Sequence, residues 1–408
     1  MHVLYPKCAG LDVHKQTVVA CARTQSGAAI TYDRQTFGTT TRELLALADW
    51  LTAHGCTHVA MESTGVFWKP VWHVLADAFD LVLANPQHIR NVPGRKSDVT
   101  DAEWIAELLA HGLIRSSFVP PPAVQALRDL TRTRAQLVRE IARHTQRVQK
   151  TLQDANLKLT SVLSDITGKT GRAILAALVA GETDPERLAN LTQGRLKASR
   201  TELMEALHGH VTPHHRFLLH LHLAQIDTLE AAVRDVEARV GDGLLPFQAA
   251  VGHLITMPGV SATVARVIVA EIGIDMTRFP TAGHLLSWAG LCPRLDESAG
   301  KRRSTRTRPG TPWLKTTLVQ AAWAAVKVKD SYLRALFRRI QSRRGAKKAI
   351  VAVAASMLTA AYHMLKEGVD YRELGPQHLT RVDKTKLARR LVRRLQDLGF
   401  HVEAQVAA

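Results

Sequence analysis

Cysteine, aromatic residues and acidic side chains are all scarce in this sequence of 408 residues. The four cysteines lie far apart and form no Cys-x-x-Cys pair, which disfavours a disulfide scaffold and a zinc ribbon. No signal-peptide pattern opens the sequence, and the longest apolar run, residues 349–365, is short for a membrane span and contains polar side chains. We therefore expect a soluble, cytoplasmic protein with no membrane partner, and a buried helix over residues 349–365.

Basic residues outnumber acidic ones, and the excess is concentrated in one part of the chain. The sequence has 54 Lys and Arg against 36 Asp and Glu, a formal net charge of +18. Residues 251–408 contain 27 basic and 11 acidic residues, whereas residues 1–118 contain 10 and 11. Such an excess points to a polyanionic partner, either nucleic acid or an anionic membrane surface. We expect residues 251–408 to bind nucleic acid.

The length and the secondary-structure signals predict three parts. Residues 1–118 begin with three strand-like segments and continue with alternating helix and strand patterns. This is the order of a ribonuclease-H-like (RuvC-like) α/β domain, a mixed sheet with helices on both faces. Residues 119–250 predict a helical, coiled-coil linker or assembly region, and residues 251–408 a mostly helical C-terminal domain. The strands are expected at residues 8–13, 17–23, 28–32, 57–61 and 81–84, and helices at residues 41–54, 66–79, 98–111, 262–272, 311–328, 347–366 and 387–395.

The middle part contains a row of arginines at helical spacing beside apolar residues. These are Arg128, Arg132, Arg139 and Arg143. Residues 217–240 have a similar periodicity. Two long helices that fold back on each other would form a helical hairpin or a coiled coil, which usually dimerises or spaces domains.

Four carboxylates in the first part favour a metal site. Asp12 ends the first expected strand, in Gly-Leu-Asp-Val-His-Lys, and Glu62 ends the fourth, in Met-Glu-Ser-Thr-Gly. Asp98 and Asp101 are three residues apart at the start of a helix and therefore share one face. In a ribonuclease-H-like sheet the first and fourth strands are neighbours and the last helix crosses beside their ends, so the four acids would converge. Mg²⁺ takes oxygen ligands, and two such ions about 4 Å apart activate a nucleophile and stabilise a leaving oxygen. Taken singly, each acid also fits a helix cap or a solvated strand end.

A polar, basic stretch over residues 291–308 contains a candidate nucleophile. Ser298 lies in Glu-Ser-Ala-Gly-Lys, and a serine hydroxyl attacks only once its proton is taken, which nearby carboxylate-bound Mg²⁺ would favour. Ser304 is a nearby competitor, and a plain turn serine is the other interpretation. Lys301 and the arginines after it would neutralise charge on a phosphate. The expected nucleic-acid-binding side chains are Lys301, Arg302, Arg303, Arg306, Arg308, Arg338, Arg339, Arg343, Arg344, Lys347 and Lys348; solvated helix or loop faces are the alternative.

A Met-Pro-Gly-Val turn at residues 257–260 precedes the helix expected at residues 262–272. A glycine-containing turn between two helices can hold a phosphate with its backbone N–H groups. A plain turn explains the pattern equally well.

These motifs together resemble those of a known family. Residues 10–15, 61–65 and 96–109, and later residues 257–273, 287–304 and 312–325, are similar to the DEDD-type transposases of bacterial insertion sequences. Those recombinases are related to Piv-type DNA invertases, and members are guided by a bridge RNA. The resemblance implies that Asp12, Glu62, Asp98 and Asp101 hold Mg²⁺. It also implies that Ser298 becomes covalently linked to a DNA strand end.

The resemblance further implies the partners of this protein. They are double-stranded DNA (the element ends or circle junction, and the target), a bridge-type guide RNA, and further copies of the chain in a homodimer or homotetramer. We predict a DNA transposase that moves an insertion sequence by Mg²⁺-dependent strand cleavage and exchange. The alternatives are a RuvC-like Holliday-junction resolvase that uses water, a non-catalytic DNA-binding protein, and an actin-like ATPase, for which the sequence supplies few of the required phosphate-loop glycines.

Overall fold

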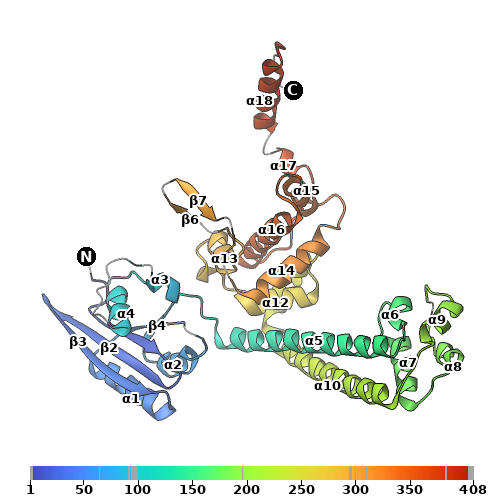
Figure 1. Ribbon diagram of the computed structural model, residues 1–408. Helices are drawn as coiled ribbons and strands as arrows, with labels where there is room; N and C mark the ends of the chain where they lie inside the picture. Colours follow the sequence, from blue (N-terminus) through green and yellow to red (C-terminus); the bar gives the residue numbers. More distant parts are fainter. Residues whose placement is uncertain are drawn as a thin grey trace. The chain divides into compact units, whose positions relative to one another are not determined.

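The protein folds into two compact units, Met1–Val119 and Pro120–Ala408 (Figure 1). The computed structural model describes residues 3–63, 65–90, 92, 100–194, 196–293, 296–298, 300–304, 306–307, 310–381 and 384–402. The first unit contains a mixed sheet with helices, and the second is mostly helical. This confirms the expected combination of an N-terminal α/β part with a mostly helical remainder.

The sheet of the first unit has the strand order β3-β2-β1-β4-β5. The strands are β1 (Lys7–Val13), β2 (Thr17–Ser26), β3 (Ala29–Gly38), β4 (His58–Glu62) and β5 (Asp80–Ala84). β1, β2 and β3 form an antiparallel meander, whereas β4 pairs parallel to β1 and β5 parallel to β4. All five expected strands form. β3 continues beyond its expected end at residue 32. The prediction ended too early because residues 29–36 are exposed, so their sequence has no alternation of buried and exposed residues.

Helices cover both faces of this sheet, as expected. They are α1 (Thr41–Ala53), α2 (Trp68–Leu75), α3 (Pro86–Arg90) and α4 (Asp101–Ala110). One core joins apolar residues of α1 and α2 to Leu11 and Val13 of β1. A second core joins Ile105 and Leu108 of α4 to Cys8 of β1 on the opposite face. The helix α4 begins at Asp101, and the start expected at residue 98 lies outside the described residues.

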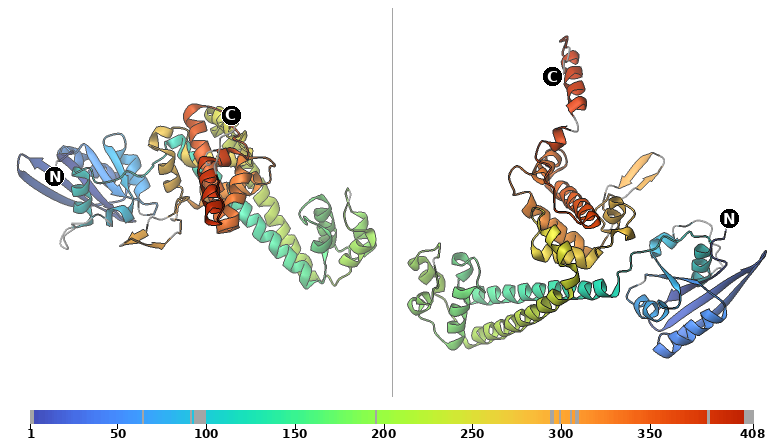
Figure 2. Two further views of the ribbon diagram at one scale, coloured as in Figure 1. Left: turned by 90° about the horizontal axis from the view of Figure 1, so that it is seen from above. Right: turned by 180° about the vertical axis from the view of Figure 1, so that it is seen from behind.

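Two long helices, α5 (Pro122–Asp154) and α10 (Pro213–Gly243), pack along each other in the second unit (Figures 1 and 2). The chain between them forms α6 (Leu159–Val162), α7 (Lys169–Ala180), α8 (Pro185–Asn190) and α9 (Arg200–Leu207). These helices bury a core that includes Leu152 of α5 and Leu219 of α10. The two helical runs of the middle part therefore form an antiparallel pair within one chain.

The remaining described helices of the second unit include α16 (Ala346–Glu367), against which several of them pack. The others are α11 (Gln248–Ile255), α12 (Ala262–Ile272), α13 (Ala282–Trp288), α14 (Pro312–Ala325) and α15 (Tyr332–Arg344), followed by α17 (His378–Arg381) and α18 (Lys384–Asp397), with short 3₁₀ turns at Leu245–Phe247 and Met276–Arg278. By length and composition α16 could cross a membrane, but half of its apolar stretch is buried inside the protein. α16 contacts α11, α13, α14 and α15. It is the buried helix that we expected over residues 349–365.

The turn at residues 257–260 packs against α14. Gly259 has φ +80°, and a β-carbon there would lie 2.4 Å from the carbonyl oxygen of Ala321. Met257 and Val260 are buried beside it. This close approach requires glycine at residue 259 and packs the turn against α14.

Candidate functional site

Two of the predicted acids occupy matching positions on neighbouring parallel strands. Leu11 of β1 pairs with Met61 of β4, and Asp12 and Glu62 are the next residues along each strand. Side chains alternate along a strand, so Asp12 lies on the same face as Cys8, and Glu62 on the same face as Ala60. Cys8 and Ala60 both belong to the core beneath α4. The two carboxylates are therefore neighbours on the α4 side of the sheet, at its carboxyl edge.

The third acid, Asp101, starts the helix that covers this face. The thiol of Cys8 donates to the carbonyl oxygen of Ala106, at 3.6 Å. Two residues further along β1, a β-carbon on Gly10 would lie 2.1 Å from the carbonyl oxygen of Ala102. Moving along β1 toward Asp12 thus leads toward the N-terminal end of α4, where Asp101 is the first helical residue.

The described acids do not form a closed ligand cluster. Within the ranges that the structure describes, no three His, Cys, Asp or Glu side chains lie close enough to hold a metal ion. Asp12 contacts His14 instead, with 3.2 Å between the carboxylate oxygen and the imidazole Nε2. The fourth acid, Asp98, lies outside the described residues. All three described acids offer carboxylate oxygens, the donor type that Mg²⁺ prefers.

A buried charge network fixes α4 on the sheet, and the sequence interpretation missed it. Arg23 of β2 has a fully buried side chain, and its Nε donates to Glu107 of α4 at 2.8 Å. Tyr32 of β3 donates its hydroxyl to the same carboxylate at 2.7 Å, and His111 contacts the other oxygen at 3.0 Å. Burial opposes ionisation of Glu107, but hydrogen bonds from Tyr32 and Arg23 outweigh it and hold the pKa of Glu107 below its usual value. Arg23 inside the apolar run of β2 was the sequence feature that could have indicated a buried ion pair.

Ser298 is the last residue of a short strand. β6 (Asp296–Ser298) pairs antiparallel with β7 (Lys301–Ser304), and Ser298 is opposite Lys301 across a two-residue connection. Gly300 in that connection has φ +73°, the left-handed conformation that glycine adopts readily. The polar stretch, for which the sequence predicted no strand, therefore contains a β-hairpin, and Ser298 lies next to its tip.

The competing serine has a different setting. Ser304 ends β7, and its hydroxyl oxygen accepts a hydrogen bond from the backbone N–H of Arg306, at 3.2 Å. Lys301 and Arg306 are exposed, the side chains of Ser298, Arg302 and Arg303 lie outside the described part, and so does the whole of Arg308. The two serines therefore lie at opposite ends of the hairpin, Ser298 beside its tip and Ser304 at the end of β7.

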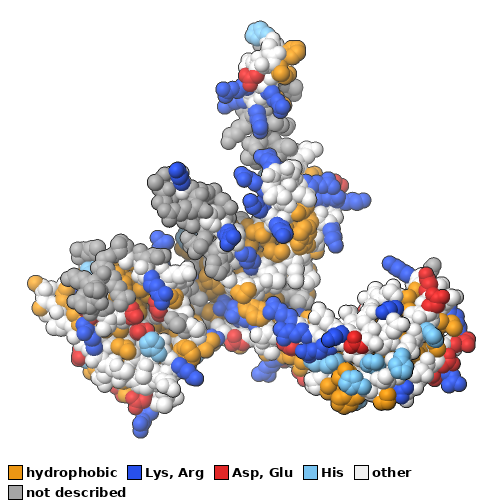
Figure 3. All heavy atoms as spheres, viewed as in Figure 1, with side chains coloured by type: hydrophobic (Ala, Val, Ile, Leu, Met, Phe, Trp, Pro, Cys, Tyr) orange, Lys and Arg blue, Asp and Glu red, His pale blue; other side chains and the backbone are white. Residues whose placement is uncertain are grey.

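The other predicted basic residues lie on two consecutive helices. Arg338, Arg339, Arg343 and Arg344 belong to α15, and Lys347 and Lys348 to the first turn of α16; all six are exposed. Lys and Arg side chains gather over these C-terminal helices in Figure 3. The basic face of α18 adds exposed arginines that the sequence interpretation did not include: Arg389, Arg390, Arg393 and Arg394.

Comparison with known proteins gives matches at both ends of the chain. Residues 9–157 match a family model for the DEDD transposase of IS110, described as "Transposase", and residues 252–338 match one described as "Transposase IS116/IS110/IS902 family". A "Probable family 20 transposase" of Pseudomonas aeruginosa is 26% identical over 321 residues, which cover 77% of this chain and 85% of that protein. The "Insertion element IS110 uncharacterized 43.6 kDa protein" of Streptomyces coelicolor is 30% identical over 145 residues, 35% of each chain. From these two domain matches and these relatives, the chain belongs to the IS110 family of insertion-sequence transposases.

Proposed function

We propose that this transposase cleaves and rejoins DNA strands with a divalent metal held by Asp12, Glu62, Asp98 and Asp101, and with Ser298 as nucleophile. The observation that carries the proposal is the matched register of Asp12 and Glu62 beneath α4. The strand order, with β1 between an antiparallel β2 and a parallel β4, also supports a ribonuclease-H-like domain. Bound Mg²⁺ would stabilise the negative charge that develops on the phosphate oxygens.

In the proposed reaction, the hydroxyl oxygen of Ser298 forms a bond to a DNA phosphorus. The bond from that phosphorus to the leaving strand oxygen breaks, the leaving oxygen takes up a proton, and the serine loses one. A strand hydroxyl then attacks the phosphoserine, which restores Ser298 and joins the new strands. Lys301, opposite Ser298 across the hairpin, would neutralise phosphate charge during both steps.

We assign a distinct role to each of three parts of the chain. Residues 1–118 would carry the metal site, residues 119–250 would assemble subunits and contact RNA, and residues 251–408 would bind DNA and present Ser298. The excess of basic residues in the last part, and their exposure on α15 and α16, support binding to a phosphate backbone. The bridge-type RNA and the homodimer or homotetramer rest on the family resemblance.

A covalent-trap assay tests the proposal. Purified protein is incubated with Mg²⁺, supercoiled DNA that carries element ends and target, and the non-coding transcript that flanks the element. We expect a protein–DNA adduct on denaturing gels that Ser298→Ala abolishes and Ser304→Ala retains. Omission of the transcript tests the RNA separately. Cleavage without an adduct would instead support a resolvase that uses water.

A further inference from the structure

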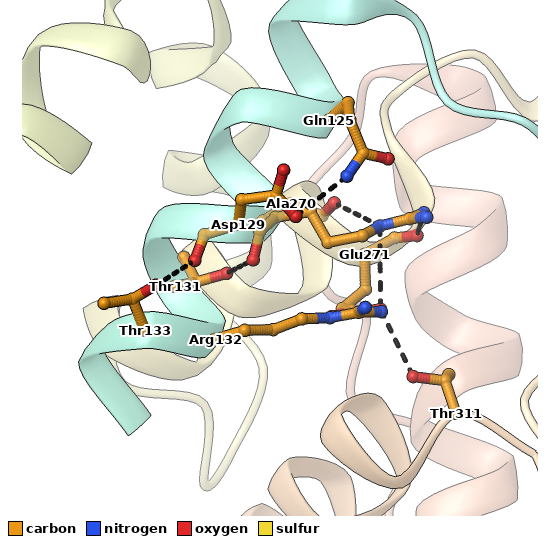
Figure 4. A network of polar contacts seen from close by, with 9 residues as sticks. Gln125, Asp129, Thr131, Arg132, Thr133, Ala270, Glu271 and Thr311 are labelled. Atoms are coloured by element: carbon orange, nitrogen blue, oxygen red, sulfur yellow. Dashed lines mark hydrogen bonds and ion pairs between the residues drawn. The ribbon is translucent and has the colours of Figure 1, made fainter. Parts of the chain in front are cut away.

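A buried ion-pair network joins the long helix α5 to α12 and to the start of α14 (Figure 4). The side chain of Glu271 in α12 is fully buried. Arg132 of α5 donates through Nε to one carboxylate oxygen at 2.8 Å and through Nη2 to the other at 2.9 Å. Thr311, the N-cap of α14, donates its hydroxyl to Glu271 at 3.3 Å. Three helices thus meet at one carboxylate.

A second arginine of α5 reinforces the same junction. Arg128 donates through Nη2 to the backbone oxygen of Glu271 at 2.5 Å and through Nε to that of Ala270 at 3.4 Å. Burial lowers the pKa of Arg128 to about 10, and Glu271 opposes that decrease. Removing one partner of a buried ion pair leaves an uncompensated charge, so loss of either arginine or of Glu271 should disrupt this junction.

The network lies where the hairpin of Ser298 joins the helices. Pro293 and Thr307 form an isolated bridge below the two strands, and Lys315 donates to Thr307 at 2.8 Å and to the carbonyl oxygen of Gly290 at 3.1 Å. A β-carbon on Gly310 would lie 2.4 Å from the carbonyl oxygen of Ala289. The segments that enter and leave the hairpin are therefore fastened together immediately before Thr311.

Arginines of α5 also contact tryptophans on both sides of the hairpin in the sequence. The guanidinium of Arg128 lies 6.0 Å from the ring centroid of Trp288, at the end of α13. The guanidiniums of Arg132 and Arg139 lie 5.8 Å and 4.8 Å from the ring centroid of Trp313, in the first turn of α14. Guanidinium–aromatic contacts of this kind are directional, so they orient both flanks of the hairpin on α5. Three arginines of α5 thus contact the two tryptophans that flank the hairpin in the sequence.

We propose that Arg132 and Glu271 are positioning residues that hold the hairpin of Ser298 in one orientation on α5. A change in the direction of the α5–α10 pair, for example on assembly with a partner, is then transmitted to the hairpin. The inference rests on the proposed role of Ser298 for its functional meaning. The physical link between α5 and the hairpin can be measured without that role.

The chain offers a matched control for this link. Arg134, two residues after Arg132 on α5, pairs with Glu237 of α10, with 2.7 Å between Nε and the carboxylate oxygen. This ion pair joins the two long helices, and among the described residues no hydrogen bond or ion pair links Arg134 or Glu237 to the hairpin flanks. Loss of the Arg134–Glu237 pair therefore tests whether any broken ion pair on α5 has the same effect.

Electron spin resonance can measure the hairpin's orientation in the full-length protein. Spin labels are attached at Gln136→Cys on α5 and Lys301→Cys on β7, both exposed positions. Cys292 is changed to Ser, because the other three cysteines are buried and Cys292 is partly exposed. We expect the width of the distance distribution to roughly double in Glu271→Gln and to rise less in Arg132→Lys, which keeps the charge but loses the second hydrogen bond. Glu237→Gln should leave it unchanged.

The unlabelled variants are then compared in the covalent-trap assay and in DNA binding. Glu271→Gln should lower adduct yield by about tenfold, because misplacement of a reacting group by about 1 Å has effects of this size or larger. DNA affinity should stay within about threefold. If Glu271→Gln fails to fold, Thr311→Val removes one hydrogen bond from the same carboxylate and takes its place.

The outcomes separate this inference from the proposed function. An unchanged distance distribution in a folded Glu271→Gln or Thr311→Val protein overturns the positioning role, whatever Ser298 does. Equal broadening in Glu237→Gln also overturns it, because the effect would then be general to α5. Broadening only in the Glu271 network, with adducts that persist in Ser298→Ala, keeps the mechanical link and removes the proposed nucleophile.

Discussion

Gly10 of β1 lies directly against Ala102 of α4, since a β-carbon on Gly10 would be 2.1 Å from the Ala102 carbonyl oxygen. The same β-carbon would be 2.4 Å from the backbone nitrogen of Ala106. Both obstacles are helix backbone, which no side-chain rotation can move away. The absent side chain at Gly10 therefore sets how closely α4, with Asp101 at its start, approaches the strand that carries Asp12.

Gly10→Ala tests this contact. We expect the methyl group to push α4 from the sheet, to lower the free energy of unfolding by about 1–3 kcal/mol or more, and to abolish most strand cleavage. Thermal unfolding and adduct yield measure the two effects. Gly241→Ala is the control, because no heavy atom lies within 4 Å of its β-carbon and alanine is the better helix former. Normal cleavage by Gly10→Ala would show that the α4 contact does not set the site.

Apolar periodicity in the sequence predicted the strands and helices that have a regular buried face. The helix expected at residues 262–272 is confirmed with the same limits, and the five expected strands form in the first unit. The β6–β7 hairpin was not predicted, because its strands are short and polar and have no buried alternation. The helix α15 was not predicted, and its residues 338–344 were interpreted only as part of a basic stretch. Leu333 is the buried residue of this helix and most of the others are polar or charged, so its sequence has little apolar periodicity.

The contacts that place the site are between residues far apart in the sequence. Arg23 and Glu107 are separated by 84 residues, and Arg132 and Glu271 by 139. An ion pair of this kind leaves no periodic signal in either segment. The acids at the strand ends could be predicted from their motifs, but the helix register that brings Asp101 toward them depends on Gly10 and Glu107, whose roles need the folded structure.

Protonation of Glu107 should loosen the first unit. Its pKa is held below the ordinary value of 4.5, so ionised Glu107 adds stability that is complete above about pH 4.5 and is lost as the pH falls through the lower, folded-state pKa. We expect Glu107→Gln to unfold at a lower temperature than the wild type near neutral pH, and the difference to shrink below pH 4.5. Thermal scans of both proteins across that range measure it. A difference in unfolding temperature that is constant with pH would mean that Glu107 stabilises the unit through packing and not through its charge.

The neighbouring carboxylates of Asp12 and Glu62 should lower the thermal stability of the protein until a cation binds. Like charges at neighbouring positions on paired strands repel, so Asp12→Asn should leave thermal stability unchanged or raised in metal-free buffer. Mg²⁺ should raise the unfolding temperature of the wild type and have little effect on Asp12→Asn. Asp80→Asn is the control, since Asp80 begins β5 at the other edge of the sheet. Equal Mg²⁺ stabilisation of wild type and Asp12→Asn would remove Asp12 from the proposed metal site.

Basic residues of α15 and α16 should set the salt dependence of DNA binding. Each phosphate contact contributes about 0.9 to the slope of log affinity against log salt concentration. We expect Arg343→Ala with Lys347→Ala to weaken binding to any sequence and to lower that slope by about 2 if both side chains contact phosphates. Binding isotherms at four or more salt concentrations give the slope.

The control for this measurement removes two arginines whose charges are already paired within the chain. Arg187 lies 3.4 Å from Glu182, and Arg200 lies 3.0 Å from Glu186, on the helices between α5 and α10. Because these guanidiniums face carboxylates, Arg187→Ala with Arg200→Ala should change the slope little although it removes the same formal charge. A similar decrease in both double variants would mean that net charge, and not the surface of α15 and α16, governs DNA affinity.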